Sequence, residues 1–288
     1  MTTMLVRDVS LFVKVIGQGY PLLLMHGGPG LDHTSLLPLR GCADQFTMVF
    51  YDHRCNGRSE GAEVTSMTWE NLTADADALR QELGFKKWAV LGHSFGGNVA
   101  LEYALRYPQS VSHLVLMDTG GDARWVQQGA PDILARRGYG AAAVSAARRF
   151  FNGQLTPSEV TTSALKFARA YYYRDSLLAL VRGVVADLDL KMRPDAHVFG
   201  FGRLLAGWNV MERLGEIRVP VLVLAGRHDF LYPPEHQAIL ADRLTDARLV
   251  LIERAGHEAP AERPDEVGAA IREFLADAHP TEGGPASR

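Results

Sequence analysis

Short, almost wholly apolar runs recur along the chain, separated by polar and amphipathic stretches. The runs lie at residues 22–25, 48–51, 88–91, 114–117, 221–225 and 249–252. Such runs are typical of strands buried on both faces, as in a parallel sheet with helices on each side. Residues 11–16 alternate in polarity, which predicts an earlier antiparallel strand with residues 17–21 as its turn.

Apolar residues three or four positions apart indicate helices between the runs. The clearest set forms one helix face: Trp69, Leu72, Ala76, Leu79 and Leu83. Thr68 precedes this helix as a capping residue, and Gly84 ends it. Further helices are predicted at residues 99–107, stopped by Pro108, and at residues 264–276. The alternation predicts an α/β fold with a mostly parallel, doubly wound sheet.

One long segment breaks this alternation. Residues 122–218 contain no strand-like run, and an excursion of this length between two strands favours an inserted helical cap. The expected organisation is a core formed by residues 1–121 and 219–278, the cap between them, and a flexible tail at residues 279–288.

The strongest chemical signal is a serine in a glycine-rich turn. Residues 92–97 read GHSFGG, directly after the run at 88–91 and directly before a helix. G-x-S-x-G in this strand–turn–helix context indicates a nucleophilic serine, here Ser94. The turn is so tight that side chains at positions 92 and 96 would collide with neighbouring backbone. Ser94 is therefore expected at a helix N-terminus, where the helix dipole favours developing negative charge.

A serine nucleophile needs a base and an orienting acid. Asp229 comes just after the run at 221–225, and His257 follows the run at 249–252. The order serine, acid, histidine is the one that this kind of sheet uses, and all three follow strand ends. We therefore expect His257 to act as general base and then acid, and Asp229 to fix its tautomer.

Asp118 is a rival for the acid. It ends the run at 114–117, and in some related folds the acid comes from that earlier strand. A carboxylate that anchors the loop is the favoured interpretation of Asp118. Asp229 remains the predicted acid.

A second glycine-rich segment is suited to stabilising an oxyanion. Residues 26–30 read HGGPG, immediately after the run at 22–25. Acyl transfer requires backbone N–H groups aimed at the oxygen of the tetrahedral intermediate. The N–H groups of Gly28 and Phe95 are the predicted pair, and His26 is expected to organise the loop.

These motifs together carry a resemblance. HGGPG, the segment YDHRCNGRS at residues 51–59, and the serine turn resemble the proline iminopeptidase branch of the α/β hydrolases, over nearly the whole chain. The resemblance implies an α/β-hydrolase fold with a helical cap. It also implies release of N-terminal proline or other residues from short peptides.

Departures from that branch favour a different substrate. His93 before the nucleophile is common in esterases, and Phe230 stands where family peptidases hold a glutamate. Residues 195–207 contain no glutamate, and Glu159 and Glu212 are interpreted as solvated helix positions. A buried ammonium without a carboxylate partner would be costly. An ester hydrolase is therefore the first prediction, and an aminopeptidase of the proline iminopeptidase kind is the alternative.

Aromatic residues support an uncharged, hydrophobic substrate. The predicted pocket residues are Trp125, Tyr172, Phe201, Trp208 and Phe230. With the triad they predict cleavage of small to medium hydrophobic esters or lactones through an acyl-enzyme. A perhydrolase or a carbon–carbon bond hydrolase would use the same triad. A binding module without activity is disfavoured because the triad and the oxyanion glycines are all present.

Composition limits the classes of binding partner that the protein is expected to have. The 288 residues carry a formal net charge of −3, which gives no electrostatic case for nucleic acid or an anionic membrane. No stretch approaches the about 18 apolar residues of a membrane span. Met1 to Ser10 does not read as a signal peptide, so a cytoplasmic location is expected, with Cys42 and Cys55 reduced. A small-molecule substrate is the predicted partner, with no metal or organic cofactor, and the oligomeric state is undetermined.

Overall fold

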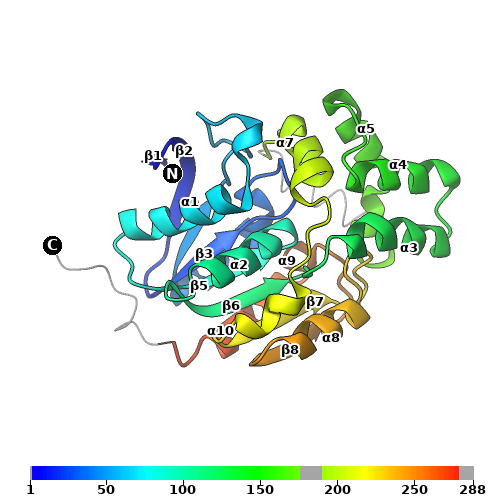
Figure 1. Cartoon of the computed structure of the whole chain (residues 1–288). Coiled ribbons are helices and arrows are strands. Elements are labelled where there is room, and N and C mark those ends of the chain that lie inside the picture. The colour runs from blue at the N-terminus through cyan, green and yellow to red at the C-terminus, as the bar shows by residue number, and fades with distance from the viewer. Residues whose placement is uncertain (1, 176–189, 279–288) are drawn as a thin grey trace.

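A single eight-stranded sheet organises the protein (Figure 1). The computed structural model describes residues 2–175 and 190–278. In chain order the strands are β1 (Thr2–Val6), β2 (Val9–Ile16), β3 (Tyr20–Met25), β4 (Phe46–Tyr51), β5 (Trp88–His93), β6 (Val111–Met117), β7 (Val221–Gly226) and β8 (Ala247–Ile252). Their spatial order is β1-β2-β4-β3-β5-β6-β7-β8. The strands from β3 to β8 pair in parallel, whereas β1 and β2 pair antiparallel.

The apolar runs all become strands, and the two edges of the sheet show where that pattern weakens. β1 was not predicted, because it is an outer strand whose first four residues are exposed or half-buried and therefore show no apolar pattern. β8 forms the other edge and is mostly half-buried, although its run reads as fully buried. Edge strands contact only one neighbour, so burial makes fewer demands on their sequence.

Helices cover both faces of the sheet. One face packs against α1 (Trp69–Glu82), α2 (Phe95–Arg106) and α8 (Pro234–Arg243). The other face packs against a 3-10 segment, His33–Asp44, and α10 (Pro264–Phe274). Thr68 caps α1 by accepting a hydrogen bond from the Asn71 N–H at 3.2 Å. Two separate hydrophobic cores result, which is the doubly wound arrangement that the alternation predicts.

The chain between β6 and β7 forms helices and loops in its described parts and adds no strand to the sheet there. Its α-helices are α3 (Ala130–Arg136), α4 (Ala141–Phe151), α5 (Val160–Leu165) and α7 (Pro194–Phe199), joined by π- and 3-10-helical turns. Its two ends meet, because Asp122 accepts a hydrogen bond from the Asn209 side chain at 2.8 Å. We call residues 122–218, as far as they are described, the helical segment. Figure 1 shows α3, α4 and α5 beyond the edge of the sheet on the side where β6 and β7 end.

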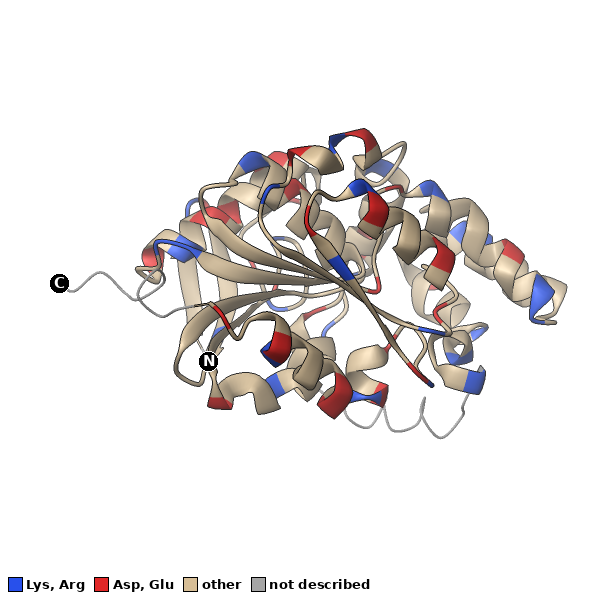
Figure 2. Ribbon diagram, turned by 90° about the horizontal axis from the view of Figure 1, so that it is seen from below, with Lys and Arg blue, Asp and Glu red and all other residues tan. Residues whose placement is uncertain are grey.

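The helical segment has a core of its own. Phe150, Phe151 and Phe167 pack together, and Phe230 and Leu231 from the loop after β7 join them. This apolar layer covers the carboxyl ends of the strands, where sites form in α/β sheets. In Figure 2 the positions of Lys, Arg, Asp and Glu lie mostly on the helices and loops around the sheet. None of the helices within the described ranges has the length and apolarity to cross a membrane.

The YDHRCNGRS motif connects the strand ends to α1. Arg54 is fully buried, and its guanidinium donates to both oxygens of Asp75, at 2.6 and 2.8 Å, and to Asp8 at 2.8 Å. Asn56 accepts a hydrogen bond from the Gly30 N–H, which ties this loop to HGGPG. The motif therefore holds the loops around the strand ends in place.

Replacing Arg54 with leucine is expected to destabilise the protein by about 2 kcal/mol or more, because the buried carboxylate of Asp75 would lose its buried partner and keep the ion pair with the solvent-exposed Arg7, at 2.7 Å. Chemical denaturation measures the change. The matched control is Arg248→Gln, because the ion pair of Arg248 with Glu273 is solvent-exposed. This substitution should change the free energy of unfolding by less than about 0.5 kcal/mol. Equal losses in the two variants would contradict the structural role of Arg54.

Candidate active site

Ser94 occupies a strained turn between β5 and α2. Its backbone has φ 53° and ψ −120°, a conformation that side-chain-bearing residues rarely adopt. The neighbouring glycines explain how the turn fits. A Cβ on Gly96 would lie 2.0 Å from the carbonyl oxygen of Met25, and one on Gly92 would lie 2.4 Å from the oxygen of Gly96. The turn therefore admits no side chain at either position, and it presents Ser94 at the N-terminus of α2.

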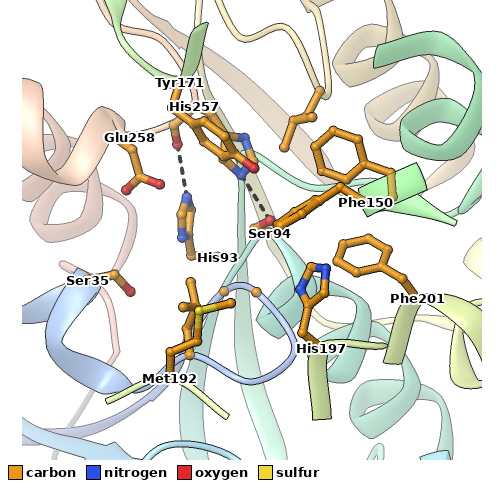
Figure 3. Close-up of a pocket in the computed structure, with 15 residues that line it drawn as sticks. Ser35, His93, Ser94, Phe150, Tyr171, Met192, His197, Phe201, His257 and Glu258 are labelled. Atoms are coloured by element: carbon orange, nitrogen blue, oxygen red, sulfur yellow. Dashed lines mark hydrogen bonds between the residues drawn. The ribbon is translucent and has the colours of Figure 1, made fainter. Parts of the chain in front are cut away.

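Ser94, His257 and Asp229 form one hydrogen-bonded row. Nε2 of His257 lies 2.9 Å from Oγ of Ser94 (Figure 3). Nδ1 of the same ring lies 2.9 Å from Oδ2 of Asp229. The Leu231 N–H donates to the other oxygen of Asp229 at 2.7 Å, which fixes the carboxylate. The geometry lets a proton pass from the serine hydroxyl to the imidazole while the carboxylate stabilises the resulting charge.

Backbone contact aligns the histidine with the acid. A Cβ on Gly226 would lie 1.9 Å from the carbonyl oxygen of Gly256, so the loops that carry Asp229 and His257 touch directly. Burial lowers the pKa of His257, but the charge of Asp229 and its hydrogen bond outweigh burial and raise the pKa above 6.5. The imidazole is thus a stronger base than its burial alone would allow.

Asp118 has a different place. It is fully buried, its Oδ1 accepts a hydrogen bond from the Gly226 N–H at 2.7 Å, and its Oδ2 has no partner among the described residues. Burial and the nearby charge of Asp229 raise the pKa of Asp118 well above its usual value. This carboxyl holds the end of β7, whereas the carboxylate that accepts the hydrogen bond from Nδ1 of His257 is that of Asp229.

The HGGPG loop lies against the serine. A Cβ on Gly27 would lie 3.1 Å from Cβ of Ser94, and Gly28, with φ 55°, borders a cavity together with Ser94 and Phe95. His26 shapes this loop. Its Nε2 accepts a hydrogen bond from the His53 N–H at 3.1 Å, so its Nδ1 donates to the oxygen of Gly27 at 2.9 Å.

Two cavities meet at Ser94. The larger cavity has about 530 Å³ and the smaller cavity about 360 Å³ between the lining atoms. Both are bordered by Gly28, Ser94, Phe201 and Leu231. The rest of the larger cavity is mainly apolar or aromatic: Leu31, Phe150, Phe151, Tyr171 and Met192. Its polar side chains, besides those of Ser94 and His257, are Ser35, His93, His197 and Glu258.

Both predicted tryptophans lie outside the linings of these cavities. Trp125 stacks on His236, with ring centroids 4.5 Å apart. Trp208 is buried, and its indole N–H donates to Glu102 at 2.8 Å. They stabilise the junction between the helical segment and the sheet.

Of the other predicted aromatic residues, one lines the cavities and two are buried outside the linings. Phe201 borders both cavities. Phe230 is fully buried behind the wall, edge-on to Tyr171 with centroids 5.2 Å apart. Tyr172 is buried outside the linings, and the neighbouring Tyr171 lines the larger cavity instead. Side-chain direction in an irregular segment cannot be read from composition, which explains the exchange.

Glu258 is not among the predicted site residues. It directly follows His257, whereas a carboxylate for the amine was expected directly after Asp229 or in the predicted cap. Glu159 and Glu212 lie at the surface, paired with Arg149 at 3.0 Å and Arg243 at 3.2 Å. Adjacency to the predicted base was the signal that could have identified Glu258. Within residues 2–175 and 190–278, no group of three His, Cys, Asp or Glu is placed to hold a metal ion.

Comparison with known proteins gives a consistent family. The proline iminopeptidase of Neisseria meningitidis serogroup B is 30% identical over 273 residues, covering 84% of each chain. The 2-hydroxy-6-oxononadienedioate/2-hydroxy-6-oxononatrienedioate hydrolase of Comamonas testosteroni is 31% identical, covering 91% of this chain and 89% of its own. The crystal structure of the proline iminopeptidase of Mycobacterium smegmatis superimposes with a TM-score of 0.75 at 25% identity, covering 96% and 97%. The family model described as the alpha/beta hydrolase fold matches residues 20–264. The chain therefore belongs to the α/β-hydrolase family and resembles the proline iminopeptidases within it.

Proposed function

We propose that this protein is a serine aminopeptidase of the proline iminopeptidase kind, which releases N-terminal residues from short peptides. The observation that carries the proposal is Glu258, a carboxylate on the wall of the cavity that holds Ser94 and His257. A peptide's free N-terminus is a cation next to the scissile carbonyl, so a carboxylate near the nucleophile suits it. The similarity to proline iminopeptidases supports this alternative over the ester hydrolase that the sequence put first.

The reaction follows from the hydrogen-bonded row. Oγ of Ser94 attacks the carbonyl carbon of the first residue, and His257 accepts the hydroxyl proton. The N–H groups of Gly28 and Phe95 stabilise the oxyanion. His257 then protonates the leaving amine, and water attacks the resulting acyl-enzyme with His257 as base. Asp229 holds the ring and stabilises its charged form.

Different parts of the cavity lining recognise different parts of such a substrate. The apolar walls, including Phe150 and Phe201, receive the first side chain, whose burial supplies affinity. Glu258 pairs with the ammonium, which would otherwise be costly to bury. The polar contact is what separates a peptide N-terminus from a neutral acyl group of the same size.

Cleavage of hydrophobic esters or lactones is the second candidate. The predominance of apolar and aromatic residues around the larger cavity favours it. Proline p-nitroanilide and p-nitrophenyl acyl esters, assayed side by side, distinguish the two. Turnover of esters alone would overturn the aminopeptidase proposal.

Glu258→Gln is expected to lower kcat/KM for proline p-nitroanilide relative to a p-nitrophenyl ester by about 10-fold or more, because the ammonium loses its charged partner. The control is Glu253→Gln, in which an exposed glutamate four residues before His257 loses an ion pair with Arg227. A ratio that stays the same in the Glu258 variant would exclude this carboxylate as the amine's partner.

The two buried carboxyls should respond differently to amidation. Asp229→Asn is expected to lower kcat by about 10⁴-fold, because the amide favours the wrong tautomer of His257. Asp118→Asn should remain within about 10-fold of the unmodified enzyme, since the amide oxygen still accepts from the Gly226 N–H and the hydrogen bond from His257 goes to Asp229. Steady-state kinetics measures both, and the reverse ranking would make Asp118 the acid.

The acid limb of the pH profile should report His257. Only the neutral ring accepts the serine proton, so kcat/KM rises with pH through the pKa of His257, which lies above 6.5. Residual activity of Asp229→Asn should show this limb at lower pH, because burial then acts without the opposing charge. A limb that moved to higher pH would contradict the assignment.

A further inference from the structure

One end of the larger cavity is polar. Figure 3 shows Ser35, His93 and Glu258 on one side of Ser94 and the rings of Phe150 and Phe201 on the other. The mechanism proposed above uses Glu258 and leaves His93 without a role. His93 is 2% exposed and stands in the strained turn, immediately before the nucleophile.

Hydrogen bonding determines the tautomer of His93. Its Nε2 lies 3.0 Å from the main-chain carbonyl oxygen of His257, and a carbonyl oxygen only accepts, so Nε2 carries the proton. Burial, followed by repulsion from His257, lowers the pKa of His93 to about 3, so the ring is neutral at ordinary pH. Nδ1 is therefore a lone-pair acceptor.

That acceptor is left unused by the protein. Nδ1 of His93 is buried and has no hydrogen-bond partner among the described residues. It lies close to the reacting centre. A Cβ added to Gly27 would be 3.0 Å from Nδ1 of His93 and 3.1 Å from Cβ of Ser94, so both atoms lie against the same glycine. A buried acceptor without a partner is unfavourable, and a ligand that donates to it relieves that cost.

We infer that Nδ1 of His93 accepts a hydrogen bond from the N-terminal amine of the substrate and selects substrates that carry one. The inference rests on the proposed aminopeptidase function. A secondary ammonium, such as that of an N-terminal proline, has two N–H bonds, and Nδ1 and the carboxylate of Glu258 accept one each. A primary ammonium has a third, for which Oγ of Ser35 offers another buried acceptor at the same end.

Two substitutions distinguish a purely structural role of His93 from a role as a hydrogen-bond acceptor for the substrate. Glutamine places its amide near the position of Nε2 and keeps the donor to the His257 carbonyl, but it has no acceptor at Nδ1. Asparagine places its amide oxygen near the position of Nδ1 and loses the donor. A structural role predicts harm from asparagine, whereas an acceptor role predicts harm from glutamine.

The test is binding to the Ser94→Ala protein, measured by calorimetry with two ligands of the same shape. L-Prolinamide carries the ring N–H groups, and cyclopentanecarboxamide has carbon in their place. We expect a preference for prolinamide of about 10-fold or more, most of it lost with His93→Gln and retained with His93→Asn. No preference, or a preference that His93→Gln leaves intact, would overturn the inference.

A second measurement needs no change at position 93. The ¹⁵N resonance of Nδ1, assigned by its absence from the His93→Asn protein, should move on addition of prolinamide and not of cyclopentanecarboxamide. An unchanged resonance at saturation would also overturn the inference. Turnover of proline p-nitroanilide by the unmodified enzyme tests the proposed function and not the role of His93. If turnover fails while binding of prolinamide depends on His93, the proposed function is overturned and the inference about His93 stands.

Discussion

Direct backbone contact between loops at the carboxyl ends of the strands is the constraint on which the site depends. The serine turn packs on the end of β3 at Gly96, and the loops after β7 and β8 meet at Gly226 and Gly256. No side chain fits between these backbones. Because the polypeptide itself sets the spacing, the row from Ser94 to Asp229 does not rely on flexible side chains to find its geometry.

The sequence predicted those features that follow from local pattern. Apolar runs give the six strands from β3 to β8, and chain order with strand ends gives Ser94, Asp229 and His257 as a group that the structure brings together. The lining of the cavity does not follow from local pattern. Phe230 and Trp208 are as aromatic as Phe201, yet of these three only Phe201 borders the cavities, because side-chain direction in the helical segment and in the loop after β7 depends on packing between distant residues. Glu258 was missed because its importance is its position in space beside the base, which composition does not reveal.

The larger cavity combines two kinds of recognition that differ in how they discriminate. Apolar walls bind hydrophobic groups in proportion to the area they bury and distinguish poorly among groups of similar size. Buried acceptors discriminate sharply, because a ligand without a donor leaves them unpaired. Nδ1 of His93 is such an acceptor and lies close to Ser94, so discrimination is concentrated next to the bond that would be cleaved.

The serine and its base are 163 residues apart in the chain, and the acid precedes the base by 28. Contacts of such long range form late, since closing a long loop costs entropy before any contact offsets it. During synthesis the residues of the serine turn therefore emerge well before β8 and the loop after it. A chain that stops short of that loop contains the nucleophile but has nothing to take its proton. Hydrolytic competence thus requires β8 and the loop after it to be in place, so enzymatic activity reports that this edge of the sheet has formed.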